Sequence, residues 1–185
     1  MKHFSVIAAL LLLASPASAA HWNVDAAKSR LGFTVQWSGQ PYNGVFKSWK
    51  AKIDFDPADL AHASADVVID VASESSGDDE TDEGVKGAQG FQASQFATAH
   101  FQTTGFTHKG GNDYVANGNL TLRGVTKSVT LPFTLTLSGN SAHMAGTAQV
   151  SRMEFGVGQG GDFAKPAPVA YQVAIKVDLT ATKAP

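Results

Sequence analysis

The stretch from Val125 to Ser138 alternates between apolar and polar residues with a strict period of two. Its odd positions are apolar except for Lys127, and its even positions are mostly threonine and serine. Successive side chains of a β-strand point to opposite faces, so this pattern predicts a strand with one apolar face and one solvated face. An apolar strand face of this length must be covered by other parts of the chain.

The same alternation returns along most of the sequence. Together with the first stretch, it predicts about eight strands at hairpin spacing. The other strands are expected over residues 31–37, 45–55, 67–71, 101–108, 114–122, 142–150 and 171–179. Pro132 cannot donate a backbone hydrogen bond, so it predicts a bulge or a strand edge at its position.

Residues 77–96 show a helical pattern instead. An acidic start is followed by Val85, Ala88 and Phe91 near helical spacing, which predicts a short helix. One short helix cannot cover so many strands, so the apolar strand faces must cover each other. The pattern therefore predicts an all-β fold, either two packed sheets or one sheet rolled into a barrel, and closure also removes exposed edges.

The first twenty residues differ from the rest of the chain and are typical of a secretory signal peptide. Lys2 and His3 precede an apolar run over residues 4–14, and small residues follow up to a cleavage point after Ala19 or Ala20. This run is too short to serve as a stable membrane anchor. We expect residues 21–185 to form one domain that acts outside the cytoplasm without inserting into a membrane.

The overall composition is that of an ordinary globular chain. Hydrophobic residues make up 43% of the sequence, the formal net charge is −2, and there is no cysteine. This balance does not suggest nucleic acid as a partner. Because the chain has no cysteine, its stability must come from packing rather than from disulfides.

Three sequence motifs resemble cofactor or metal sites, but each lacks a feature that such a site requires. Residues 156–161 have the spacing GxGxxG, but Pro166 and Pro168 exclude the helix that a dinucleotide fingerprint requires. The acidic run 78–83 lacks the ligand spacing of a calcium loop. His100 and His108 are too far apart to bind one metal locally. We therefore predict no cofactor and no metal site.

His21 has one further possible role, as a copper ligand. Cleavage after Ala20 would leave it as the first residue, with an α-amine and an imidazole that together chelate copper, and cleavage after Ala19 would abolish the arrangement. No catalytic serine, histidine and carboxylate set and no pair of catalytic carboxylates can be identified. The sequence therefore predicts a protein that is not an enzyme.

One segment resembles a known family. NLTLRGVTKSVTLPFTL, residues 119–135, is similar to the signature strand pair and turn of the YceI-like family, the periplasmic polyisoprenoid-binding proteins. Other segments follow in the family's order, so the resemblance covers essentially the whole chain after residue 21. They are WNVDAAKSRLGFTVQWSG, GVFKSWKAKIDFDP, DEGVKGAQGFQASQFATAHF, SRMEFGVG and YQVAIKVDLTA.

The resemblance implies an extended, lipocalin-like antiparallel β-barrel whose apolar interior holds a long isoprenoid chain. A barrel of about eight strands is the size at which side chains fill the interior or one slender ligand occupies it. The predicted cavity lining comes from the inward strand positions and the helical segment. It comprises Phe33, Val35, Trp37, Val45, Trp49, Ile53, Phe55, Ile69, Phe91, Leu131, Phe133 and Leu135.

Arg152 is the candidate contact for a ligand head group, because it follows two inward positions and enters the glycine-rich loop. The alternative is a structural arginine that pairs with a carboxylate at a strand end. Arg123, between two strands and before Gly124, is interpreted as a turn residue.

The leading functional hypothesis is a periplasmic binding or carrier protein for an isoprenoid-type lipid, polyprenyl or quinone-like. Two alternatives stay open at this point. One is an enzyme that acts on a lipid or a small polar substrate at the barrel mouth, and the other is a stress-related interaction module with a filled core. The sequence leaves a homodimer open and does not identify a membrane partner.

Overall fold

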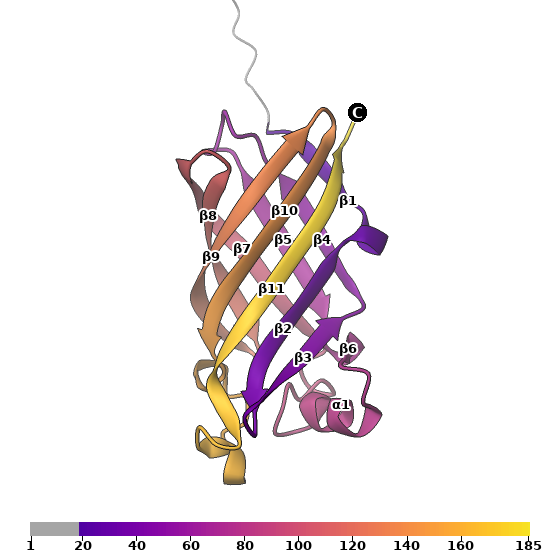
Figure 1. Ribbon diagram of the computed structural model, residues 1–185, viewed down its shortest axis with the longest axis vertical. Coiled ribbons are helices and arrows are strands. Elements are labelled where there is room, and N and C mark those ends of the chain that lie inside the picture. Colours follow the sequence, from indigo (N-terminus) through magenta and orange to yellow (C-terminus); the bar gives the residue numbers. More distant parts are fainter. Residues whose placement is uncertain (1–18) are drawn as a thin grey trace, which may run out of the picture.

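A computed structural model describes residues 19–185, except for the side chain of Asp162 (Figure 1). The predicted signal peptide therefore lies almost wholly outside the described residues. Within that range, no helix is long and apolar enough to cross a membrane.

Strands dominate the structure, with one α-helix and four short 3-10 helices between them. The strands are β1 (His21–Val24), β2 (Arg30–Trp37), β3 (Gln40–Phe46), β4 (Trp49–Asp54), β5 (Ser64–Asp70), β6 (Glu74–Ser75), β7 (Thr98–Gly110), β8 (Asp113–Leu122), β9 (Val125–Ser138), β10 (Ser141–Ser151) and β11 (Val169–Lys183). The helices are η1 (Ala26–Lys28), η2 (Val71–Ser73), α1 (Asp79–Lys86), η3 (Arg152–Phe155) and η4 (Gly161–Ala164).

The strands form one closed antiparallel barrel, elongated along the vertical axis of Figure 1. The ring runs β1-β4-β5-β7-β8-β9-β10-β11 and closes where β11 pairs with β1, through Trp22 opposite Lys183. Strand β2 pairs with β11 further along, with Leu31 opposite Val177. Strands β1 and β2 thus occupy one position in the wall, interrupted by η1. Of the two predicted arrangements, the rolled sheet is the one that forms.

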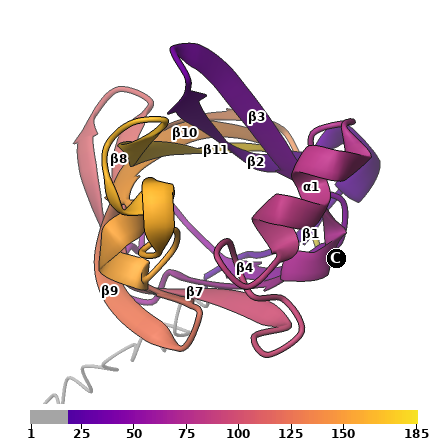
Figure 2. The same ribbon diagram turned by 90° about the horizontal axis from the view of Figure 1, so that it is seen from below.

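Helix α1 lies across one end of the barrel, beside the loops that carry η3 and η4 (Figure 2). It begins after Asp78, whose carboxylate accepts a 2.8 Å hydrogen bond from the Thr81 amide, as an N-cap does. The short helix predicted within residues 77–96 is confirmed, but it ends at Lys86. Gly87 follows as the C-cap, and at Gly90 a Cβ atom would collide with the Val85 carbonyl, so the chain turns.

The opposite end of the barrel is packed with aromatic side chains. The ring of Phe55 lies 5.1 Å from that of Phe106 and 5.6 Å from that of Tyr114, and Tyr114 stacks on Phe133 at 5.6 Å. The indole of Trp22 donates a 2.9 Å hydrogen bond to the Phe55 carbonyl, which satisfies its one polar atom. This end is therefore filled by side chains, whereas α1 and the loops that carry η3 and η4 lie at the other end (Figure 2).

Pro132 lies where the wall opens slightly. The ladder between β9 and β10 runs from Ser138 only as far as Phe133, and Pro132 is the next residue of β9. On its other side β9 stays paired, with Pro132 opposite Val115. The predicted strand edge is thus found on one side of β9, where the missing amide hydrogen would have faced β10.

Candidate functional site: the cavity inside the barrel

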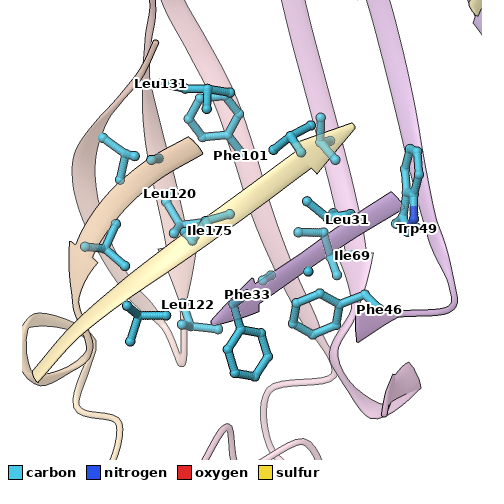
Figure 3. A pocket seen from close by; sticks show the side chains of 18 of the residues that line it. Leu31, Phe33, Phe46, Trp49, Ile69, Phe101, Leu120, Leu122, Leu131 and Ile175 are labelled. Carbon is cyan, nitrogen blue, oxygen red and sulfur yellow. The ribbon is translucent and has the colours of Figure 1, made fainter. Parts of the chain in front are cut away.

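The inward faces of the strands enclose a cavity of about 610 Å³. Its lining runs from Leu137 and Ala181 near the aromatic end to Gln89 and Phe163 near α1. The close-up view shows apolar side chains from β2, β4, β5, β7, β8, β9 and β11 pointing toward the same space (Figure 3). The interior is therefore hollow along the barrel rather than filled.

The structure places every predicted lining residue except Val45 on this cavity. Those residues are Phe33, Val35, Trp37, Trp49, Ile53, Phe55, Ile69, Phe91, Leu131, Phe133 and Leu135.

The structure corrects the placement of Val45. Strands β2 and β3 meet in a two-residue turn, Ser38-Gly39, in which both residues have positive φ, as a type I′ hairpin requires. The hairpin pairs Phe33 with Gly44, so the inward face passes from odd positions on β2 to even positions on β3. Val45 consequently lies on the outer face, and Tyr42 and Phe46 line the cavity.

Several lining residues were missing from the predicted set. They come mainly from β8, β10, β11 and the segment after α1, and they include Ala116, Leu120, Ala148, Val150, Ile175, Val177, Val85 and Gln89. The alternation in β8, β10 and β11 was visible in the sequence and could have identified most of them. Of the segment after α1, only Phe91 was predicted to line the cavity, because residues 87–90 form a turn that has no strand period.

Aromatic rings gather at the α1 end of the cavity. The ring centroids of Phe33 and Phe91 are 5.7 Å apart, those of Phe33 and Phe46 are 5.9 Å apart, and Trp37 lies 6.1 Å from Phe163. Their spacing is that of favourable edge and tilted aromatic pairs. This end therefore offers flat apolar surfaces close to the exposed side chain of Gln89.

Arg152 is not placed for contact with a head group. It is 5% exposed, and its guanidinium donates hydrogen bonds to backbone carbonyls of the loop that η3 and η4 belong to. The acceptors are the carbonyl oxygens of Val157 (2.9 Å), Gly158 (2.9 Å), Phe163 (2.6 Å), Lys165 (3.2 Å), Val169 (2.8 Å) and Ala170 (3.0 Å).

These contacts use all five N–H groups of the guanidinium, so none remains for a ligand. Burial also lowers the pKa of Arg152 from its ordinary value. The alternative, an arginine paired with a strand-end carboxylate, does not hold either, because no such partner occurs among the described side chains. Arg152 organises the loop at the cavity end through carbonyl groups.

A buried polar cluster beside α1 was not predicted. Glu74 and Asp82 are 1% and 2% exposed, and both approach the hydroxyl of Tyr42, at 2.9 Å and 3.2 Å. That hydroxyl has one hydrogen to donate to two carboxylates, and the second oxygen of Glu74 has no hydrogen-bond partner. Burial raises the pKa of Glu74 to about 6. Burial opposes ionisation of Asp82 as well, but hydrogen bonds from Ser76 lower its pKa to about 2.

Glu74 should make the free energy of unfolding decrease as the pH rises. Its pKa of about 6 lies above the ordinary value of 4.5, so the folded state binds this proton more tightly than the unfolded state does. The stability that the protonated Glu74 contributes is fully present below pH 4.5, and it is lost as the pH rises through 6. We expect the free energy of unfolding to fall by about 2 kcal/mol across that interval.

Urea unfolding at a series of pH values measures this effect. Glu74→Gln should flatten the profile between pH 4.5 and 6, because the amide cannot ionise. Glu154→Gln, a matched change at an exposed glutamate, should leave the profile as in the wild type. Identical profiles for the wild type and Glu74→Gln would show that Glu74 is not the titrating group.

Comparisons with known proteins agree with this fold. The YceI-like domain model matches residues 22–181. A UPF0312 protein of Shewanella baltica is 33% identical over 148 residues, which are 78% of this chain and 73% of the relative. The crystal structure of Burkholderia cenocepacia BcnA is 36% identical, with a TM-score of 0.83, and the match covers 86% of this chain and all of that one.

A more distant structure has the same fold. It is a polyisoprenoid-binding domain from Saccharophagus degradans, implicated in plant cell wall breakdown. It is 16% identical to this chain, with a TM-score of 0.68, and the match covers 89% of this chain and 99% of that one.

Proposed function

This chain belongs to the YceI-like domain family, and on that premise we propose that it is a periplasmic binding or carrier protein for an isoprenoid-type lipid. The observation that carries the proposal is the elongated apolar cavity of about 610 Å³ inside the barrel. An interaction module with a filled core would not contain such a cavity. The expected signal peptide supports a periplasmic location.

The size of the cavity fits a short to medium isoprenoid tail. With about 30 Å³ for each water-sized group, a volume of 610 Å³ holds on the order of 20 methyl or methylene groups. That number corresponds to about four isoprene units of five carbons. A longer chain would extend beyond the barrel, and its end would remain outside.

Burial of such a tail is sufficient for tight binding. At about 0.8 kcal/mol for each buried CH₂ group, 20 carbons contribute roughly 16 kcal/mol before costs. Association and ordering cost about 4 to 15 kcal/mol. Micromolar binding needs about 8 kcal/mol, which this balance can supply without any polar contact.

The lining favours binding over catalysis. Among the described side chains, the polar groups on the cavity include the Tyr42 and Thr103 hydroxyls and the Arg152 guanidinium, which protein groups engage, and the Gln89 amide, which does not ionise. An enzyme needs reactive groups that face the substrate with altered proton affinity. The Glu74 and Asp82 carboxylates have shifted pKa values, but they do not line the cavity.

Mass spectrometry of organic extracts tests the proposal. The protein should be expressed with its N-terminal segment, recovered from the periplasmic fraction and purified without detergent. We expect an isoprenoid lipid in about equimolar amount, and an unrelated periplasmic protein purified in parallel should lack it. Repeated extracts without any apolar ligand would contradict the proposal.

A further inference from the structure

The barrel wall has a gap in its side. Strand β1 pairs with β4 only through His21 opposite Asp54 and Trp22 opposite Ile53. Strand β2 pairs with β3 instead of β4. Within the described chain, no ladder joins residues 23–31 to residues 46–52. The backbone at Lys47, between β3 and β4, is not hydrogen-bonded to β2 through its amide. That amide donates a 3.1 Å hydrogen bond to the Ser73 carbonyl instead.

Only side chains close this gap. Phe46 and Trp49 line the central cavity on the inside and also line a separate hollow of about 430 Å³ on the outside. Both side chains are half-buried, and they lie with Leu31 beside β2 and β4 in the close-up view (Figure 3). Two aromatic side chains therefore separate the hollow from the cavity.

The other break in the wall is closed differently. Where the ladder between β9 and β10 ends at Phe133, the 3-10 helix η3 packs against both strands. Phe155 of η3 is 1% exposed, so it is fixed in the core. Opening that break would displace backbone, whereas no ladder of the described strands crosses the gap at Phe46 and Trp49.

The outer hollow carries positive charge. Arg30 and Lys47 are the charged residues on its lining. Two carboxylates lie near these cations without lining the hollow: Asp178, which is opposite Arg30 in the ladder and contacts His143 at 3.1 Å, and the buried Glu74, whose pKa is raised by burial and lowered in part by the charge of Lys47. Because the lining of the hollow includes Arg30 and Lys47 but no carboxylate, an anion that enters it contacts the two cations directly.

We propose that this gap is a side door to the cavity: the isoprenoid tail passes between Phe46 and Trp49, and a phosphate-type head group stays outside at Arg30 and Lys47. The inference rests on the proposed function and adds a route and a head-group class to it. A tail that enters through the side of the wall does not have to displace α1 at one end, or the packed rings of Phe55, Phe106, Tyr114 and Phe133 at the other.

Site-specific labelling tests the route, because the chain contains no cysteine of its own. Ser48→Cys places a thiol at the outer hollow, and Ala88→Cys places one at the α1 end of the cavity. The fluorescence of Trp22, Trp37 and Trp49, which all line the cavity, reports binding of geranylgeraniol in stopped flow.

A bulky maleimide at residue 48 should slow both association and dissociation of geranylgeraniol about tenfold or more, because it obstructs the route and so raises the barrier in both directions. The same label at residue 88 should leave both rates unchanged. Slower exchange with the label at 88, and normal exchange with the label at 48, would overturn the proposal.

Charge reversal tests the head-group seat. At low salt the wild type should bind geranylgeranyl phosphate about tenfold more tightly than geranylgeraniol. The double variant Arg30→Glu and Lys47→Glu should lose this preference and keep its affinity for the alcohol. Lys127→Glu, a matched reversal at an exposed site on β9, should behave as the wild type.

Inorganic phosphate separates the two sources of a phosphate group. We expect it to bind the hollow much more weakly than the tailed phosphate, which marks the hollow as a lipid head-group seat. Equally tight binding of inorganic phosphate would assign the hollow to the free ion and overturn the proposal. If the wild type binds the alcohol but shows neither effect, the side door fails and the proposed function stands. If it binds no prenol at all, the proposed function itself fails.

Discussion

Replacing Ala148 with phenylalanine should lower the affinity for geranylgeraniol at least about 100-fold, while the barrel stays folded. Ala148 lies on β10 opposite Ile175, is 3% exposed and lines the cavity. A phenylalanine ring at this position would enter the hollow and divide it, so a tail would lose contact with the part beyond. The added ring occupies existing space and therefore does not overpack the core.

The neighbouring residue provides a matched control. Gln149 lies on the same strand and is exposed, so Gln149→Phe adds the same ring to the outer face. Its affinity for geranylgeraniol should equal that of the wild type. Titration followed by tryptophan fluorescence measures both variants, with circular dichroism to show that they are folded. Equal affinity for Ala148→Phe and Gln149→Phe would mean that the ligand does not occupy the cavity.

Replacing Arg152 with alanine should reduce the free energy of unfolding by about 3 to 5 kcal/mol. The change would leave six carbonyl oxygens without this donor, four between η3 and β11 and two at the start of β11, and the bond to Gly158 is fully buried. Hydrogen bonds to a charged group are among the stronger ones, and an unpaired buried carbonyl bears its full desolvation cost. Urea unfolding measures the loss.

Two further variants show whether geometry or charge matters at Arg152. Arg152→Lys keeps the charge but offers three donors in place of a planar fork, so it should recover only part of the lost stability. Arg123→Ala removes an arginine that also donates to carbonyls, those of Ala88 and Gly90, at a less buried site, and should cost about 1 kcal/mol. If Arg152→Ala kept its stability but lost affinity for a tailed phosphate, Arg152 would be a head-group contact after all.

Local periodicity predicted the wall of the barrel well. The alternation in β9 appears directly as burial, with Val129, Leu131, Phe133 and Leu135 buried and their even neighbours exposed. The predicted α-helix was found as well, because its acidic start and N-cap are local signals. Period-two arguments need only neighbouring residues, which a single sequence supplies.

The parts that were not predicted depend on contacts between distant residues. Closure through β1 and β11 brings residues 22–24 to residues 181–183, and no local pattern distinguishes this from two packed sheets. The barrel was expected from the resemblance instead. The parity change at Ser38-Gly39 was readable in principle, because a two-residue turn pairs odd with even positions, and the error at Val45 came from carrying one parity through the turn.

The two buried polar clusters also depend on contacts between residues that are distant in the sequence. Arg152 receives its acceptors from a loop without regular pattern, and Glu74 meets Tyr42 and Asp82 from different elements. A sequence shows that these residues can ionise, but it does not show which groups surround them. The side gap is equally invisible, since it results from β2 pairing with β3 where β1 pairs with β4.

The most direct test of the account is the affinity for a series of prenyl alcohols of increasing length. If the barrel cavity holds the tail, each added isoprene unit should tighten binding about tenfold or more up to about four units, after which the affinity should level off because the space of about 610 Å³ is full. An affinity that does not depend on chain length, or no binding at any length, would contradict the central claim.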